Sequence, residues 1–168
     1  MEKWVVTAKK ADFQGIGRKY GIDPVIARII RNRDITGDEA IEEYLNGTLA
    51  DIPSWKLLKD IDKAVEIISG KIDAGTKMRI IGDYDIDGVT ATYILLKGFK
   101  RLGANVDTYI PDRVADGYGI HDHLIKKAME DGIDTIVTCD NGISASSQIT
   151  YAKELGMTVV VTDHHEVP

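Results

Sequence analysis

Three carboxylates at alternate positions, and two adjacent imidazoles further along the chain, are the side chains best suited to chemistry. The carboxylates follow an apolar run, 78–81, and are those of Asp83, Asp85 and Asp87. Carboxylates this close raise one another's pKa unless positive charge lies between them, and divalent cations that prefer oxygen ligands supply that charge. The imidazoles follow a second apolar run, in the cluster Asp163, His164 and His165. Together the two clusters predict a metal-dependent phosphoesterase.

Strand-like and helix-like segments alternate from residue 76 onward, and these elements must position the clusters. The strand-like runs are apolar and partly β-branched, at 78–83, 105–110, 134–139 and 158–162. The helix-like runs between them span 89–102, 120–131 and 144–155. This βαβ rhythm predicts an α/β fold, a parallel β-sheet with helices on both faces. Right-handed crossovers place the carboxyl end of every strand at one edge of the sheet, where ligand sites in such sheets lie.

Polar clusters follow all four predicted strands, so we expect them to meet at that edge. Besides the two clusters above, Arg113 and its neighbours follow the second strand, and Asp140 follows the third. Asp140 and the two residues after it are also an ordinary turn signal, so a purely structural role stays open for them. Adjacent histidines point in different directions, so one of His164 and His165 is expected to reach a metal while the other faces substrate.

The donor set, carboxylates with one or two imidazoles, suits Mn²⁺ or Mg²⁺, and the nitrogen ligands favour Mn²⁺. Two such ions can bind a phosphodiester oxygen and lower the pKa of a water molecule. Gly88 is expected to open the next helix, whose N-terminus offers backbone donors and a dipole to a phosphate. Thr90 lies in the first turn of that helix and is a candidate phosphate contact.

Other readings of the Asp-x-Asp-x-Asp-Gly pattern are weaker. An EF-hand calcium loop needs a preceding helix and a glutamate at its twelfth position, which here is Ile94. A solvated acidic turn leaves the convergence of acids and histidines at one edge without explanation. No Gly-x-x-x-x-Gly-Lys-Ser/Thr loop is present and no Gly-x-Gly-x-x-Gly follows the first strand, which argues against P-loop NTPases and dinucleotide-binding proteins.

The segment 1–75 is predicted to be mainly helical and to precede a domain at 76–168. Its helix signals are Asp23 before Pro24, the pair Thr36 and Glu39 with capping-box spacing, and Asp60 before helically spaced apolar residues. Residues 1–33 hold eight Lys/Arg and three acidic residues. This basic stretch is either a solvated helical face or a phosphate-contacting arm. A helix-turn-helix is also open, although nothing marks a recognition helix.

The bulk composition is that of a protein with a substantial core. Of the 168 residues, 43% are hydrophobic and 29% are charged, and the net charge of −6 argues against a wholly basic nucleic-acid binder. No apolar run approaches the roughly 18 residues that suggest a membrane helix, and the N-terminus lacks the apolar segment of a signal peptide. The single cysteine, Cys139, forms no internal disulfide. These features predict a cytoplasmic protein without membrane association.

Four motifs resemble a known family; they lie at 82–90, 111–119, 140–144 and 163–165, and a similar helical segment precedes them at 58–64. The segment 82–90 and the Asp-His-His sequence at 163–165 resemble the signatures of the DHH phosphoesterase superfamily. The segment 111–119, with Pro-Asp-Arg and Gly-Tyr-Gly, and the segment 58–64 resemble its RecJ branch, the single-strand-specific exonucleases. The resemblance covers roughly residues 50–168, and the fold it implies is the parallel sheet predicted above.

The resemblance also implies roles for the candidate residues. Four match the family's metal-ligand positions: Asp85, Asp87, Asp140 and His164. Asp140 is expected to bridge two ions in the complete enzyme, and Asp83 is a further ligand or supports one. His165 matches a position that contacts the scissile phosphate, and Asp163 is expected to orient a histidine. Two further residues are implied as DNA contacts: Arg113 and Tyr118.

The activity implied is metal-dependent 5′ to 3′ degradation of single-stranded DNA, an exonuclease of DNA repair and recombination, with single-strand-binding protein as a partner. Family members continue beyond the Asp-His-His motif with a further aspartate ligand and a second domain that grips substrate. The chain is therefore expected to be an N-terminal piece with weak metal binding and little nuclease activity.

Three alternatives remain open. A small-substrate member of the superfamily, of the oligoribonuclease or pyrophosphatase type, tends to carry a histidine where Ile81 stands here. A non-catalytic adaptor with the same fold does not need the intact acids and histidines. A receiver-like phosphoacceptor domain also clusters acids at strand ends, but it has no use for paired histidines.

Overall fold

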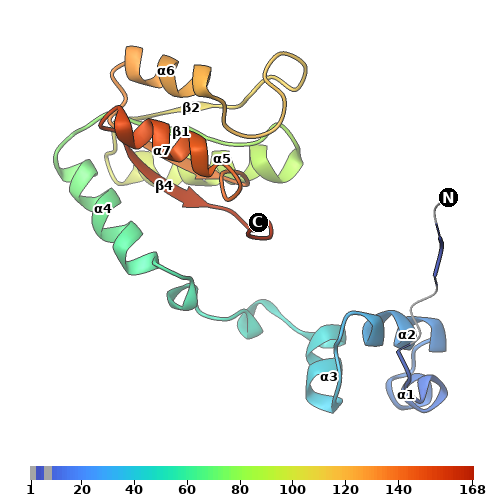
Figure 1. Cartoon of the computed structure of the whole chain (residues 1–168). Coiled ribbons are helices and arrows are strands. Elements are labelled where there is room, and N and C mark those ends of the chain that lie inside the picture. The colour runs from blue at the N-terminus through green and yellow to red at the C-terminus, as the bar shows by residue number, and fades with distance from the viewer. Residues whose placement is uncertain (1–2, 6–8) are drawn as a thin grey trace. The chain divides into compact units, whose positions relative to one another are not determined.

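The computed structural model describes residues 3–5 and 9–168. The chain divides into two compact units, Met1–Leu57 and Leu58–Pro168, which are described separately (Figure 1).

The first unit is helical, as the sequence predicts. It contains the helices α1 (Phe13–Tyr20), α2 (Pro24–Asn32) and α3 (Asp38–Asn46), followed by the 3₁₀ turns η1 (Leu49–Asp51) and η2 (Trp55–Leu57). The predicted cap of α2 is confirmed, because the side chain of Asp23 accepts a 2.8 Å hydrogen bond from the Val25 N–H. The capping box predicted at Thr36 is wrong. Gly37, at φ +87°, caps α3 instead, and no side chain makes a capping hydrogen bond there.

The second unit is built on four parallel strands: β1 (Met78–Ile81), β2 (Val106–Tyr109), β3 (Thr135–Cys139) and β4 (Thr158–Thr162). Their order in the sheet is β2-β1-β3-β4. Met78 pairs with Val106 on one side and with Thr135 on the other, so β1, β2 and β3 begin at the same level in the sheet. The carboxyl ends of all four strands therefore lie at one edge of the sheet.

Helices cover both faces of this sheet, which confirms the predicted α/β fold. They are α4 (Ile61–Asp73), α5 (Ile86–Arg101), α6 (Asp122–Glu130) and α7 (Ser146–Glu154). Side chains of a strand alternate between the faces, so Ile136 and Val137 of β3 belong to different core clusters. The cluster with Val137 is covered by α4 and α5, and the cluster with Ile136 contains residues of α6 and α7 (Figure 1).

Helix α5 begins at Ile86, three residues before the predicted start, and the difference matters for the site. The Asp85 carboxylate accepts a 3.0 Å hydrogen bond from the Gly88 N–H and so caps the helix. Asp85 thus stands at the helix N-terminus and Asp87 lies within the first turn. The strand before it is correspondingly shorter than predicted and ends at Ile81.

A buried cation ties β1 to its neighbours. Arg79 donates to both carboxylate oxygens of Asp107 on β2, at 2.7 and 2.8 Å, and to Asp131 at the end of α6, at 2.9 Å. Two carboxylates thus satisfy one buried guanidinium.

No helix in the described ranges is both long and apolar enough to cross a membrane.

Candidate metal centre

The site lies where the chain changes direction across the sheet. From the central strand β1 the chain moves outward to β2, and it then returns to β3 on the other side of β1. Ligands of open parallel sheets bind at such a switch point, beyond the carboxyl ends of the strands. The loops after β1, β3 and β4 bring the two predicted acidic and histidine clusters there, together with Asp140.

A first ligand group consists of Asp83, Asp85 and Asp140, each of which offers an oxygen within 4.8 Å of the others. Asp83 is only 3% exposed, and within residues 3–5 and 9–168 its buried Oδ1 has no hydrogen-bond partner. A buried carboxylate oxygen without a donor is costly, and a cation between the three side chains would satisfy it. The hydrogen bond from the Gly88 N–H lowers the pKa of Asp85 and so favours its charged form.

Gly88 permits this approach of helix and loop. A Cβ at this position would lie 2.7 Å from the Cβ of Asp83 and 2.7 Å from its carbonyl oxygen, closer than atoms pack. Only glycine therefore lets the first turn of α5 lie against Asp83.

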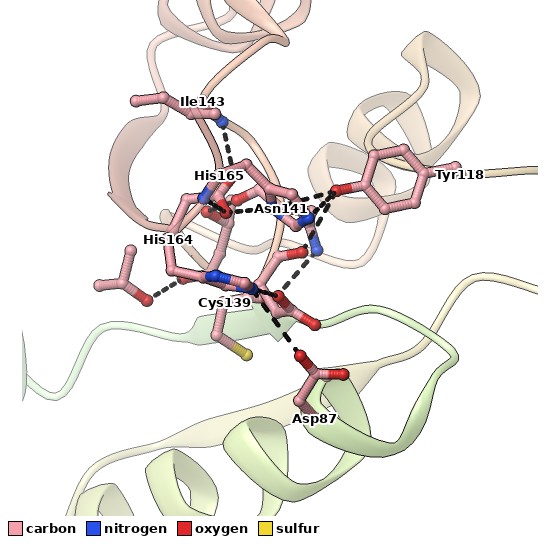
Figure 2. Close-up of polar contacts among 12 residues, drawn as sticks. Asp87, Tyr118, Cys139, Asn141, Ile143, His164 and His165 are labelled. Carbon is pink, nitrogen blue, oxygen red and sulfur yellow. Dashed lines mark hydrogen bonds and ion pairs between the residues drawn. The ribbon is translucent and has the colours of Figure 1, made fainter. Parts of the chain in front are cut away.

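A second ligand group consists of Asp140, His164 and His165, whose candidate ligand atoms also lie within 4.8 Å of one another. His164 Nε2 is 2.9 Å from Asp140 Oδ1 and 3.8 Å from Asp87 Oδ2, so the imidazole lies between an acid that follows β3 and one in the first turn of α5 (Figure 2). The structure therefore brings these predicted residues together: His164 lies beside Asp140, and Asp140 offers an oxygen within 4.8 Å of one from Asp85.

Asp140 is common to both groups, and its surroundings suit a cation. It is 7% exposed, and its backbone has φ +60°, a left-handed conformation that is unusual outside glycine. Burial raises its pKa, the carboxylates of Asp87 and Asp85 raise it further, and His164 opposes them. Its Oδ1 lies 2.9 Å from His164 Nε2 and is buried without a hydrogen-bond partner among the described residues. Excess negative charge and unsatisfied oxygens fit a divalent cation.

His165 is held by Asp163. The two side chains meet at 2.6 Å through Nδ1, and Asp163 also accepts from the backbone N–H groups of Ile143 at 3.0 Å and His165 at 3.1 Å. Burial alone would raise the pKa of Asp163, but these donors outweigh it and the pKa is lowered. The bond with Asp163 in turn raises the pKa of His165, so the imidazole is fixed in orientation and its charged form is favoured.

The predicted substrate contacts lie at different places around the centre. The Tyr118 hydroxyl is 3.4 Å from His165 Nδ1 and 3.5 Å from its Nε2, and the two rings meet edge to face (Figure 2). The Arg113 guanidinium lies over the Tyr84 ring, 5.4 Å from its centroid, beside the loop that carries Asp83 and Asp85. Thr90 is exposed and donates its hydroxyl proton to the Ile86 carbonyl at 2.6 Å, within its own helix.

Two residues that support the site were not singled out from the sequence. Asn141 is fully buried and donates to the carbonyls of Ile81 at 3.2 Å and Cys139 at 3.1 Å, which joins the ends of β1 and β3. The polar pair at 140–141 after an apolar strand was the available signal, but an ordinary turn explains it equally well. Asp116 accepts from Tyr109 and the Asp112 N–H, and it fastens the loop that carries Arg113 and Tyr118.

The sequence of this chain matches a known family and several of its members. Residues 77–168 match the model of the DHH family, N-terminal domain. The single-stranded-DNA-specific exonuclease RecJ of Salmonella typhimurium is 37% identical over 145 residues, 86% of this chain and 24% of that protein. RecJ of Bacillus subtilis is 34% identical over 165 residues, 98% of this chain and 21% of that protein. The chain thus spans about a quarter or less of the length of these curated relatives.

Two solved structures share the fold. A crystal structure of exonuclease RecJ bound to manganese is 36% identical with a TM-score of 0.64, and the match covers 72% of this chain and 30% of that one. RecJ of Thermus thermophilus in complex with Mn²⁺ is 28% identical with a TM-score of 0.62, and the match covers 93% of this chain and 21% of that one. Since the family model spans more than half of the chain, including every residue of both ligand groups, the chain belongs to the DHH family.

Proposed function

We propose that this chain carries part of the active site of a divalent-metal-dependent phosphodiesterase that degrades single-stranded DNA, as an exonuclease acting 5′ to 3′. The observation that carries the proposal is the position of Asp140, which belongs to two ligand groups at the carboxyl ends of three strands. The names of the relatives support DNA as substrate, and the manganese in two related structures supports the metal. The direction of degradation follows the resemblance of the sequence motifs.

The residues present would hold two cations. Asp83, Asp85 and Asp140 offer oxygens to one, and Asp140 and His164 offer an oxygen and a nitrogen to the other, with Asp87 beside His164. When bound, Mn²⁺ or Mg²⁺ supplies Lewis acidity at a phosphate oxygen and makes a water molecule more acidic. The imidazole nitrogen favours Mn²⁺.

His165 supplies positive charge at the phosphate in this proposal. Asp163 occupies its Nδ1 and raises its pKa, which leaves Nε2 as a donor aimed by the rest of the ring. A charged donor held in place before substrate arrives stabilises the negative charge that develops on a phosphate oxygen. Asp163 touches no substrate and acts by positioning His165.

The substrate strand would run past the loop after β2. Tyr118 lies beside His165, where an aromatic ring can stack on a base, and Arg113 is an exposed cation near the first ligand group. Thr90 can contact a phosphate as a donor only by giving up its bond to Ile86. The proposal includes a cytoplasmic location and single-strand-binding protein as a partner, both of which follow from the sequence and its resemblance.

Binding of Mn²⁺ to the purified chain, followed by the electron paramagnetic resonance of the free ion, tests the proposal. Asp140→Asn removes one charge from both groups, so we expect it to weaken binding by about tenfold or more. Asp62→Asn, an exposed aspartate of α4, is the matched control and should bind as the unchanged chain does. Any cleavage of single-stranded DNA above background should disappear with Asp140→Asn. Unaltered Mn²⁺ affinity in that variant would overturn the ligand assignment.

A further inference from the structure

Helix α5 connects the metal centre to a basic surface. It begins with two of the candidate ligands, Asp85 as its cap and Asp87 in its first turn, and runs to Arg101. Its 16 residues span roughly 24 Å at 1.5 Å per residue. A ligand lying along its exposed side would therefore reach from the last turn of the helix to the catalytic edge of the sheet.

The second half of α5 carries three cations and no acidic side chain. Between Gly88 and Asn105 the sequence contains no acidic residue but has three cations, in a chain of net charge −6. The three are Lys97, Lys100 and Arg101. In the part of the chain that the structure describes, none of them has a carboxylate within 4.0 Å, whereas cations such as Lys19, Lys71 and Arg79 do.

An exposed aromatic ring lies beside these cations. Tyr93 is 58% exposed, and the Lys97 ammonium lies 5.6 Å from its ring centroid. Together with Leu96 and the other two cations they line a shallow hollow of about 370 Å³. Positions 93, 97 and 100 are spaced four and three residues apart and so share one face of the helix.

Stability of the helix does not account for this combination. Cations in a last turn do complement the helix dipole, which explains Lys100 and Arg101 in isolation. Lys97 lies before that turn, and the dipole effect falls off within one turn. The helix dipole also gives no reason for an exposed tyrosine in the same hollow. Aromatic rings for bases and cations for phosphates, repeated along a groove, are the features by which proteins bind single strands without reading their sequence.

We propose that the exposed face of α5 formed by Tyr93, Lys97, Lys100 and Arg101 is a binding track for single-stranded nucleic acid that leads to the metal centre. This inference rests on the proposed function, because it names the path of the substrate strand outside the ligand groups. Phosphates lie on the three cations and a base stacks on Tyr93.

Fluorescence anisotropy of a labelled oligothymidylate tests the track in EDTA, where no hydrolysis occurs. The variant K97Q/K100Q/R101Q should weaken binding about tenfold or more, and the log–log dependence on salt should become shallower by about 2, since each phosphate contact contributes about 0.7. The control K126Q/K127Q/K153Q removes the same charge from α6 and α7 on the other face of the sheet, and it should change the affinity by less than about twofold.

Tyr93 gives a separate measurement that does not depend on charge. Y93A should weaken binding about fivefold or more, because a base loses its stacking surface. Y93F keeps the aromatic ring and should bind as the unchanged chain does. The track is wrong if the triple variant and Y93A bind as the unchanged chain does, or if the control triple variant weakens binding equally.

These measurements distinguish failure of the proposed metal centre from failure of the proposed track on α5. Asp140→Asn should weaken Mn²⁺ binding about tenfold or more and keep oligonucleotide binding in EDTA. If it loses Mn²⁺ while the α5 variants keep full oligonucleotide affinity, the metal centre stands and the track is refuted. If it keeps Mn²⁺ while the α5 variants lose the oligonucleotide, the metal centre is refuted and the nucleic-acid surface stands.

Discussion

At the scale of single residues, neighbouring groups shift the pKa values of the side chains at this site. Burial and two other carboxylates raise the pKa of Asp140, while the Gly88 N–H lowers the pKa of Asp85 in the same group. His165 is pushed toward its charged form by Asp163. Three side chains within one cluster thus have pKa values that move in directions set by local contacts.

Asp163→Asn should lower the pKa of His165. The asparagine keeps the shape and can still accept from the Ile143 N–H, but it no longer offers a charge to the imidazolium. Titration of the histidine resonances by nuclear magnetic resonance, in EDTA, measures the shift. Asp62→Asn is the control, and an unchanged midpoint for His165 in Asp163→Asn would contradict the assigned contact.

Asp131→Asn should reduce the free energy of unfolding at neutral pH and make it less sensitive to acid. The hydrogen bond from Arg79 lowers the pKa of Asp131 in the folded state, so the carboxylate stabilises the fold above its unfolded pKa of about 3.9. That contribution is lost as the pH falls through the lower folded pKa.

Urea unfolding at several pH values measures this effect. The difference between the unchanged chain and Asp131→Asn should be constant from about pH 5 to 7 and should shrink below about pH 4. A difference that persists undiminished in acid would mean that shape, rather than charge, is what Asp131 contributes.

Among the elements, the bounds of a strand are easier to predict from the sequence than the hydrogen bonds made by the side chains that follow it. Strand β4 was predicted with the observed bounds, because a run of β-branched residues ended by a polar cluster has few alternatives. The predicted start of helix α5 is too late, since its cap is Asp85, which also belongs to the first ligand group. The role of Asn141 could not be predicted, because its two acceptors lie on different strands and only the fold brings them together.

Gly142→Ala should destabilise the turn after β3. Gly142 has φ +109°, and an added Cβ would lie 2.8 Å from Thr138 Oγ1. We expect a loss of about 2 to 3 kcal/mol in the free energy of unfolding, from the backbone conformation and the clash together. Gly132→Ala is the control: its φ of +72° is also positive, but nothing lies within 4 Å, so a loss of about 1 kcal/mol is expected. Equal losses in urea unfolding would contradict the clash.

Over the whole molecule, the parallel sheet and its helices should fold without the first unit. Both large core clusters and both ligand groups draw only on residues after Leu57. A chain of residues 58–168 is therefore expected to unfold cooperatively and to keep its Mn²⁺ affinity. Circular dichroism and Mn²⁺ titration measure the two properties, and loss of either would contradict the independence of this unit.

The domain boundary predicted from the sequence, between 75 and 76, is tested by a shorter chain, 76–168. This chain lacks α4, whose residues Ala64, Ile67, Ile68 and Ile72 pack against the core on one face of the sheet. Exposing that face should lower the melting temperature relative to 58–168 or abolish folding. Equal stability of the two chains would place the boundary at 76.

A carboxylate that serves two ligand groups ties the filling of one to the filling of the other. If both groups bind cations as proposed, the first cation would take up charge that Asp140 otherwise offers to the second, and two cations held by one side chain would repel each other. In the proposed two-cation centre, occupancy would thus be anticooperative: the second equivalent would bind more weakly than the first, and the concentration of free metal would decide whether one ion or two are held.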